Sequence, residues 1–180
     1  VNNTPSSRWY SGSGIYRDVD LTITDDVHVD LNGTKVTTPN LETEKGSTVN
    51  TNVTATVAND SDAAKSVAVR HTVFPKDGSA DQSIGTVTTN AQSIAAGATA
   101  EIQATVPVSN PELWSVENPS LYTVRTEVLV DGQVTDTYDT EYGFRYFNFD
   151  SNTGFSLNGE NMKLKGVCMH HDQGSLGAAA

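Results

Sequence analysis

The run His170-His171-Asp172 is the densest group of side chains in this sequence that could do chemistry, and Cys168 stands two residues before it. A catalytic thiol needs a histidine base within hydrogen-bonding reach, yet residues two apart on a strand lie about 6.5 to 7 Å apart. Adjacent strand residues point to opposite faces, and no third ligand stands at a usual metal-site spacing. The sequence therefore predicts no metal site and favours a small buried residue at Cys168.

A second candidate is the segment Asp150-Ser151-Asn152-Thr153-Gly154, whose side-chain oxygens imitate the start of a calcium-binding loop. It lacks the closing glutamate and the flanking helices of such a loop. We interpret it as a turn stabilised by side-chain oxygens. The carboxylate pairs Glu42/Glu44 and Asp136/Asp139 stand in hydrophilic stretches typical of a solvated face, and we expect no general acid and base among them.

Two further histidines, His28 and His71, stand outside any motif. His71 alternates with Val67, Val69 and Val73, which places all four on one face of a predicted strand. His71 is therefore expected to be a core or edge residue rather than a ligand.

The composition excludes several classes of protein. The 180 residues include 22 acidic and 11 basic side chains, a formal net charge of -11, so most of the surface should repel a phosphate backbone and nucleic acid is not an expected partner. One cysteine allows no internal disulfide. No apolar run approaches the roughly 18 residues that span a bilayer. The 23 threonines and 20 valines, against 9 leucines, favour a mostly β chain.

Strand-like segments recur every 8 to 15 residues from about Val27 to Tyr146, without an amphipathic helix between them. Asp131-Gly132 predicts a two-residue hairpin turn between two of them. Seven or eight such strands indicate an all-β, immunoglobulin-like antiparallel sandwich, although the cysteine pair and buried tryptophan of antibody domains are missing. The alternating faces are Val49 to Val57, Val67 to Val73, Ala100 to Val106, Tyr122 to Val130 and Val134 to Tyr138.

The flanking segments carry separate signals. Pro107, Pro111 and Pro119 predict that residues 107–120 form a crossing loop, which carries Trp114. Val19, Leu21 and Ile23 alternate with polar residues and predict a strand. Residues 155–157, an Asn158-Gly159 turn and the apolar run Met162–Met169 predict a small hairpin that leads into a buried strand.

Three stretches, in this order, resemble one family, the glycoside hydrolase family 2 enzymes, and within it the β-galactosidases. Residues 8–19, RWYSGSGIYRDV, resemble the passage from the family's sugar-binding jelly roll into its immunoglobulin-like domain. Residues 113–122, LWSVENPSLY, and Gly143-Phe144-Arg145 are similar to two motifs of that second domain. Residues 155–159, FSLNG, with residues 165–172, KGVCMHHD, resemble the beginning of the family's catalytic barrel.

The resemblance implies three parts of a longer enzyme: the end of a jelly roll at 1–24, a complete sandwich at 25–147, and the start of a truncated (β/α)8 barrel, with its first strand, at 148–180. Such enzymes hydrolyse β-glycosidic bonds with retention, through two glutamates about 5 to 5.5 Å apart. The family's acid/base glutamate follows an asparagine, and no Asn-Glu pair occurs here. The resemblance thus implies no catalytic residue in this chain.

The resemblance does imply substrate-binding residues. Met162, Leu164, Gly166, Cys168 and His170 would share one face of the barrel strand, which places His170 at the barrel's C-terminal mouth. The family's histidine at this position lines the sugar pocket. We extend a substrate role to His171 and Asp172, which follow, and to Arg8 and Trp9, where the jelly roll abuts the pocket in this family.

The expected partners are a β-galactoside-type carbohydrate, reached through the intact parent, and the rest of the parent chain. No cofactor is expected for this part, and the parent's metal requirement is open. A surface rich in Thr, Asn and Asp and poor in Lys suits a secreted or cell-surface bacterial parent. The alternative is a free-standing bacterial surface or carbohydrate-binding sandwich module, which would have no reason to carry a barrel's first strand after Phe155.

Overall fold

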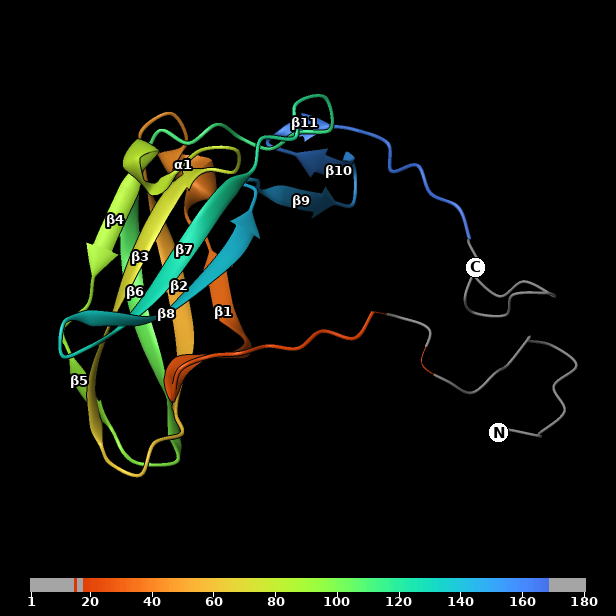
Figure 1. The fold of residues 1–180 in the computed structure, drawn as a ribbon. Helices are drawn as coiled ribbons and strands as arrows, with labels where there is room; N and C mark the ends of the chain where they lie inside the picture. The colour runs from red at the N-terminus through yellow and green to blue at the C-terminus, as the bar shows by residue number, and fades with distance from the viewer. Residues whose placement is uncertain (1–14, 16–17, 169–180) are drawn as a thin grey trace, which may run out of the picture. The chain divides into compact units, whose positions relative to one another are not determined.

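The computed structural model describes Ile15 and residues 18–168 (Figure 1). The chain divides into a unit formed by Thr24–Met162 and a second unit formed by Val1–Ile23 with Lys163–Ala180. The described residues of the second unit form no helix or strand. The architecture described below is therefore that of Thr24–Met162.

Eight strands form two sheets whose inner faces enclose the core (Figure 1). The first sheet has the order β1-β2-β6, and the second has the order β4-β3-β7-β8 with β5 also paired to β3. All pairs are antiparallel, which confirms the predicted sandwich. The strands are β1 Val27–Thr37, β2 Thr48–Asn59, β3 Lys65–Pro75, β4 Gly85–Thr88, β5 Gln92–Ile94, β6 Ala98–Ser109, β7 Tyr122–Val130 and β8 Gln133–Tyr142.

A third, smaller sheet follows the sandwich and has the order β11-β10-β9. Its strands are β9 Phe147–Asp150, β10 Gly154–Leu157 and β11 Glu160–Asn161. Helical structure in the described residues is limited to the short α1, Leu41–Glu44, and the 3-10 turn η1, Ala80–Gln82. No helix in this part of the chain is long and apolar enough to cross a membrane.

The core follows from the alternation of side chains along the strands. Inward-facing positions are mostly valine, whose branched side chain packs well on a pleated surface. They form two clusters between the sheets. The first contains Val27, Val29, Ala55, Val57, Val67, Val69, Ile94, Ile102 and Val128, and the second contains Leu41, Val49, Val53, Val73, Val106, Val108, Tyr122, Val124 and Phe144.

A polar pair separates the two clusters within the second sheet. His71 lies opposite Thr126 on the neighbouring strand, and its Nδ1 lies 3.1 Å from the Thr126 hydroxyl. Both side chains are fully buried, and His71 Nε2 has no hydrogen-bond partner. His71 is therefore a core residue, which is one of the two positions expected from the sequence.

Side-chain hydrogen bonds close one open edge of the sandwich, between β1 and β8. The Val29 amide donates to the Asp136 carboxylate at 2.9 Å, and the hydroxyls of Thr34 and Thr140 lie 2.7 Å apart. An unpaired strand edge can pair with another chain, so these bonds protect both sheets at this edge.

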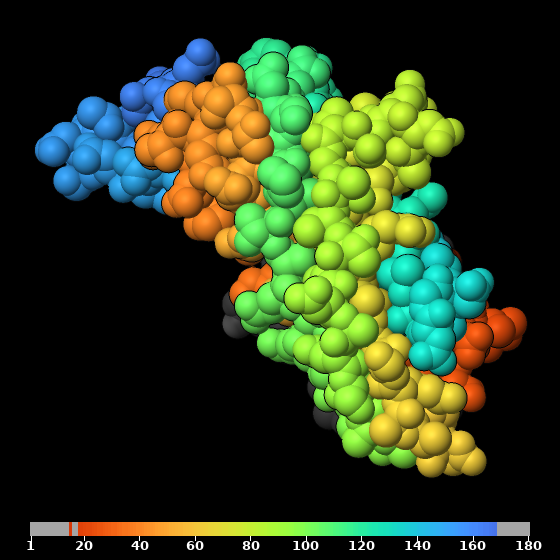
Figure 2. All heavy atoms as spheres, turned by 90° about the vertical axis from the view of Figure 1, so that its left-hand side faces the viewer, coloured from red at the N-terminus to blue at the C-terminus, as the bar shows by residue number. Residues whose placement is uncertain are grey.

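The opposite edge is closed by backbone contact between β4 and β6, whose atoms adjoin in Figure 2. The Ser109 amide donates to the Ile84 carbonyl at 2.8 Å, and a Cβ at Gly85 would lie 2.6 Å from the Pro107 carbonyl oxygen. Pro107 thus lies on an edge strand, where a missing amide is tolerated. The predicted crossing loop is wrong for residues 107–109, which belong to β6, and correct for the rest.

Two predicted turns are present. Asp131 and Gly132 have φ of 51° and 80° and join β7 to β8. Asp150 Oδ1 accepts the amides of Asn152 and Thr153, each at 2.8 Å. These bonds lower the pKa of Asp150. They confirm a turn stabilised by side-chain oxygens.

Two predicted strands do not form in this chain. Val19, Leu21 and Ile23 are exposed and outside any strand, and residues 162–168 are likewise without strand structure. Their apolar patterns fit a sheet, but a strand exists only where another backbone supplies hydrogen bonds. Cys168, expected to be buried, is exposed for the same reason.

The buried histidine predicts a loss of stability in acid. Burial lowers the pKa of His71 to about 4, whereas the unfolded chain titrates near 6.5. Between these values the unfolded state binds a proton that the folded state refuses, so stability falls as the pH drops through this window. The free energy of unfolding, measured with urea, should fall between pH 7 and pH 4.5 by about 2 to 3 kcal/mol more in the unchanged chain than in His71→Leu. His28→Leu is the control, and an equal pH dependence in the chain and in His71→Leu would refute the assignment.

Candidate functional site

Three of the stretches singled out by sequence meet at one end of the sandwich. The loop that carries Trp114, the residues that follow β8 and the turn between β10 and β11 are joined by backbone hydrogen bonds. The Trp114 amide donates to the Phe144 carbonyl at 2.8 Å, and the Asn158 amide donates to the Tyr146 carbonyl at 2.9 Å. We call these residues, with Arg145, the Asn158 junction.

Asn158 connects the third sheet to the sandwich through both ends of its amide group. Its Oδ1 accepts the Tyr146 amide at 3.2 Å, and its Nδ2 donates to the Trp114 carbonyl at 3.0 Å. Its φ of 53° is left-handed, and Gly159 follows with φ of 88°. Asparagine is one of the few residues with a side chain that tolerates this region, so one residue supplies the turn and the cross-link.

The side of the junction toward the sandwich is anchored by Phe144, which is fully buried. Its ring meets Tyr122 and Tyr142 edge to face, with centroids 5.2 and 5.1 Å away. The Tyr122 hydroxyl accepts the Glu112 amide at 2.8 Å, which ties the start of the loop to the same aromatic group. These pairs fix the position of the backbone that Trp114 and Asn158 bind.

Glycine at position 143 allows a close approach of the loop. A Cβ at Gly143 would lie 3.1 Å from Cβ of Trp114, tighter than ordinary contact. The Arg145 guanidinium lies 5.2 Å from the Trp114 ring, within range of a cation–π interaction. The indole thus contacts both the backbone of Gly143 and the charge of Arg145.

Tyr146 joins the junction to the segment after α1. The Lys45 ammonium donates to the Tyr146 hydroxyl and lies 4.7 Å from the ring centroid. The same hydroxyl would lie 3.1 Å from a Cβ at Gly159, so a small residue is needed there. Four separate segments of the chain therefore meet at this end.

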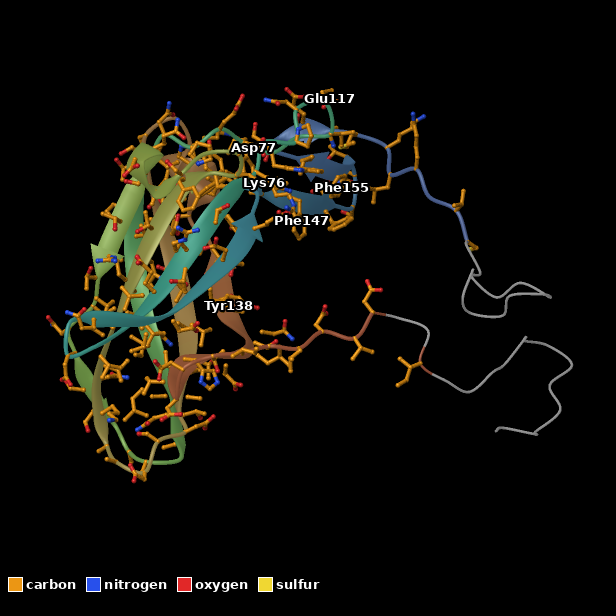
Figure 3. All side chains as sticks on the ribbon, in the orientation of Figure 1. Lys76, Asp77, Glu117, Tyr138, Phe147 and Phe155 are labelled. Carbon is orange, nitrogen blue, oxygen red and sulfur yellow. The ribbon has the colours of Figure 1, made fainter. Side chains whose placement is uncertain are left out.

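The loop itself is held by a carboxylate. Glu112 accepts the Asn118 side-chain amide at 2.7 Å and the Ser120 hydroxyl at 2.8 Å. Between this loop and the third sheet lies a hollow of about 400 Å³, near which Figure 3 shows Glu117. Its lining residues are Ser115, Glu117, Leu157, Asn158, Glu160, Asn161 and Met162.

The substrate-binding residues predicted from the sequence lie outside the described residues. These are Arg8, Trp9, His170, His171 and Asp172, and their roles stay predictions. Of the other histidines, His28 Nδ1 lies 2.9 Å from the Asp25 carbonyl oxygen, which is a local structural contact.

Three of the four carboxylates in the two pairs make contacts that stabilise the fold. Asp136 accepts the Val29 amide at the sandwich edge, and Asp139 pairs with Arg125 in two bonds of 2.8 and 2.7 Å. Glu44 accepts the amide and the side chain of Asn50, and these bonds lower its pKa. Within the described residues no three His, Cys, Asp or Glu side chains are grouped to hold a metal ion. The contacts at this end of the sandwich hold separate segments of the chain together.

Sequence reasoning found the motifs of the junction but not its connections. The Asn158-Gly159 dipeptide signalled a turn, while the use of the Asn158 amide as a cross-link depends on tertiary contact. Lys45 and Tyr146 stood in no motif, and nothing in the local sequence indicated their pairing.

Asn158→Ala should loosen the third sheet without unfolding the sandwich. The change removes two side-chain hydrogen bonds and places alanine at positive φ, at a cost of about 1 to 3 kcal/mol. Hydrogen exchange should show faster exchange of amides in β9 and β10, with β3 and β7 unchanged. Asn161→Ala is the matched control, because among the described residues the Asn161 side chain bonds to Thr153, in the turn between β9 and β10, and to Phe155 of β10, and not to the sandwich. Equal effects of the two variants would contradict the role given to Asn158.

Comparison with known proteins places this arrangement in context. The family model described as "Glycosyl hydrolases family 2" matches residues 27–145. The β-galactosidase BoGH2A of Bacteroides ovatus is 39% identical over 175 residues, which are 97% of this chain and 20% of that protein. A putative β-glucuronidase of Formosa agariphila is 34% identical over 175 residues, which are 97% of this chain and 16% of that protein.

Solved structures agree. A glycosyl hydrolase family 2 member from Bacteroides cellulosilyticus superposes with a TM-score of 0.82 at 35% identity, covering 96% of this chain and 23% of that one. The Bacteroides uniformis β-glucuronidase superposes with a TM-score of 0.79 at 32% identity, covering 93% of this chain and 20% of that one. The chain thus spans about a fifth of the length of these relatives.

The matched region, residues 27–145, contains every strand of the two facing sheets and the Trp114, Phe144 and Arg145 side of the junction. This match confirms the resemblance drawn from the motifs. The chain belongs to glycosyl hydrolases family 2.

Proposed function

We propose that this chain is a non-catalytic part of a retaining β-glycosidase, similar to β-galactosidases, in which its sandwich links a sugar-binding domain to a catalytic barrel. The observation that carries the proposal is the family match over the whole sandwich, together with relatives about five times as long as this chain. The parent's activity, its substrate and its partners are all part of this proposal.

The chemistry of the described residues supports a linking role. Retaining hydrolysis needs a carboxylate nucleophile and a carboxylic acid of raised pKa, about 5 to 5.5 Å apart. The carboxyl groups with a shifted pKa in the described part, Glu44, Glu127 and Asp150, are all shifted downward by hydrogen bonds or ion pairs. A carboxyl group held ionised in this way is a poor proton donor near neutral pH.

The Asn158 junction gives the linking role a physical form. A domain that fixes the relative positions of its neighbours must itself be rigid from one end to the other. Here Phe144, which follows β8, is buried in the core. The Asn158 side chain bonds the third sheet to the Tyr146 amide and to the Trp114 carbonyl. The third sheet is thereby oriented by the sandwich.

The proposed sugar-pocket residues of the parent are His170, His171 and Asp172, with Arg8 and Trp9. His170 is the strongest of these, because the predicted barrel strand would bring it to the mouth where barrel enzymes bind substrate. We propose a β-galactoside as substrate, supported by the β-galactosidase at 39% identity. β-Glucuronidases are also among the relatives, so a β-glucuronide is the competing substrate in the tests below.

The isolated chain should hydrolyse neither a chromogenic β-galactoside nor a chromogenic β-glucuronide above the buffer rate, because the proposal places both catalytic glutamates elsewhere in the parent. The full-length enzyme, assayed at the same molar concentration, is the positive control. Turnover by the chain alone that survives repurification would overturn the non-catalytic assignment, and a full-length protein that cleaves only the glucuronide would overturn the proposed substrate.

In the full-length enzyme, His170→Ala should lower kcat/KM roughly 30- to 1000-fold, which corresponds to about 2 to 4 kcal/mol for a pocket hydrogen bond that strengthens in the transition state. The melting temperature should stay nearly unchanged. His28→Ala, on β1 of the sandwich, is the matched control and should change neither quantity. A lowered melting temperature with normal activity per folded molecule would instead make His170 a structural residue.

A further inference from the structure

Two asparagines of this chain, Asn32 and Asn158, are followed directly by glycine. An Asn-Gly pair can react with itself, because glycine has no side chain to obstruct the approach of its amide nitrogen to the asparagine side chain. The two asparagines also share a backbone conformation, with φ of 55° and 53°. They differ in what holds the side chain, and that difference decides which of them can react.

The Asn158 side chain is held at both ends of its amide group. Its Oδ1 accepts the Tyr146 amide at 3.2 Å, and its Nδ2 donates to the Trp114 carbonyl at 3.0 Å. The residue is also half-buried. To approach the Gly159 nitrogen the side chain must give up both bonds, which requires a local opening of the Asn158 junction.

Asn32 is exposed on β1, where the register between β1 and β2 shifts between Val29 and Thr34. The side-chain hydrogen bonds of this stretch engage Val29, Leu31 and Thr34. None among the described residues engages the Asn32 side chain. Within this part of the chain, nothing has to be broken before the Asn32 side chain can turn toward the next nitrogen.

The fold itself requires this reactive pair. A Cβ at Gly33 would lie 2.7 Å from the Asp30 carbonyl oxygen and 2.9 Å from the Thr56 carbonyl oxygen, closer than real Cβ atoms come. Position 33 must therefore be glycine. The left-handed φ at position 32 favours asparagine, one of the few residues with a side chain that tolerates it.

We propose that Asn32 is a site of spontaneous deamidation, whereas its hydrogen bonds protect Asn158 from the same reaction. The Gly33 backbone nitrogen loses its proton to solvent and attacks Cγ of Asn32. A C–N bond forms, the Cγ–Nδ2 bond breaks and ammonia leaves, which closes a succinimide ring. Water then opens the ring at one of its two carbonyl carbons, which gives aspartate or isoaspartate. No atom is oxidised or reduced, and water is the only co-reactant.

The modification falls on a closed edge of the sandwich. Asn32 lies in sequence between Val29, whose amide donates to Asp136, and Thr34, whose hydroxyl contacts that of Thr140. Either product adds a negative charge to an already acidic chain, and isoaspartate also adds one carbon to the backbone between the two contacts. Amides of β1 should therefore exchange faster in the isoaspartate form than in the unmodified chain.

The test follows the peptides that contain Asn32 and Asn158 by mass spectrometry while the chain is held in mildly alkaline buffer at body temperature. In the folded chain the Asn32 peptide should convert from amide to acid about tenfold or more faster than the Asn158 peptide. In concentrated urea the two should convert at similar rates, because the junction is then open. Asn32→Gly is the matched control, since glycine accepts positive φ; it should abolish conversion at position 32 and leave Asn158 unchanged.

Equal rates at the two asparagines of the folded chain would overturn the inference, and so would conversion of Asn32 in urea alone. Anion exchange separates the converted chain from the unmodified chain by its added charge, so hydrogen exchange can be measured on each. Unchanged exchange of β1 in the isoaspartate form would refute the effect on the edge. These results do not depend on the activity of the parent, so they stand or fall separately from the proposed function.

Discussion

The two sheets of the sandwich bury one layer of side chains between them, and the rest of the structure depends on that constraint. Because strand side chains alternate, every second residue of β2, β3, β6 and β7 must be apolar or must find a partner inside. Valine meets the requirement at most positions. Buried polar exceptions include the His71/Thr126 pair, where a hydroxyl partners one ring nitrogen, and Thr51, whose hydroxyl has no hydrogen-bond partner among the described residues. Once the inward-facing side chains are buried or hydrogen-bonded, the residues on the outer faces and at the ends of the sandwich are free to vary. The ion pairs Arg70–Glu127 and Arg125–Asp139 lie across neighbouring strands, where they support the strand register in a strongly acidic chain.

Both lateral edges of the sandwich are closed, so its two ends can carry different loops without exposing unpaired strands. On one edge Asp136 accepts a backbone amide of β1, and on the other Gly85 lets β4 approach the backbone of β6. Both devices leave little free edge for another chain to extend. In the proposed linking role, contacts with a neighbouring domain would fall on the loops and on the third sheet, which the Asn158 junction holds to the sandwich.

Local sequence was sufficient for the features that depend on local physics. The period-two pattern indicated the strands of the sandwich, Asp131-Gly132 indicated its hairpin, and Asp150 indicated its side-chain turn. Ordered motifs around Trp114, Phe144 and Asn158 indicated the family. Contacts between segments distant in the sequence were not predictable in this way: the pairing of Lys45 with Tyr146 has no local signal. The strands predicted at Val19–Ile23 and from Met162 onward, which residues 19–23 and 162–168 do not form, show the converse limit, because an apolar pattern forms a strand only when a partner strand is present.

The same reasoning separates Phe147, Phe149 and Phe155 of the third sheet, whose rings are in mutual contact, from the other apolar side chains of the chain. A single exposed hydrophobic residue needs no explanation, because much of any protein surface is apolar. Three phenylalanines in contact on one face, with Asn148 and Ser156 on the other, repeat in a small sheet the pattern by which the sandwich buries Val67 and Val69. In the sandwich a second sheet covers that pattern, and in the third sheet Phe147 and Phe149 stay exposed. Because sheets pack through faces on which apolar side chains alternate with outward polar ones, the third sheet has the form of one layer of a packed pair.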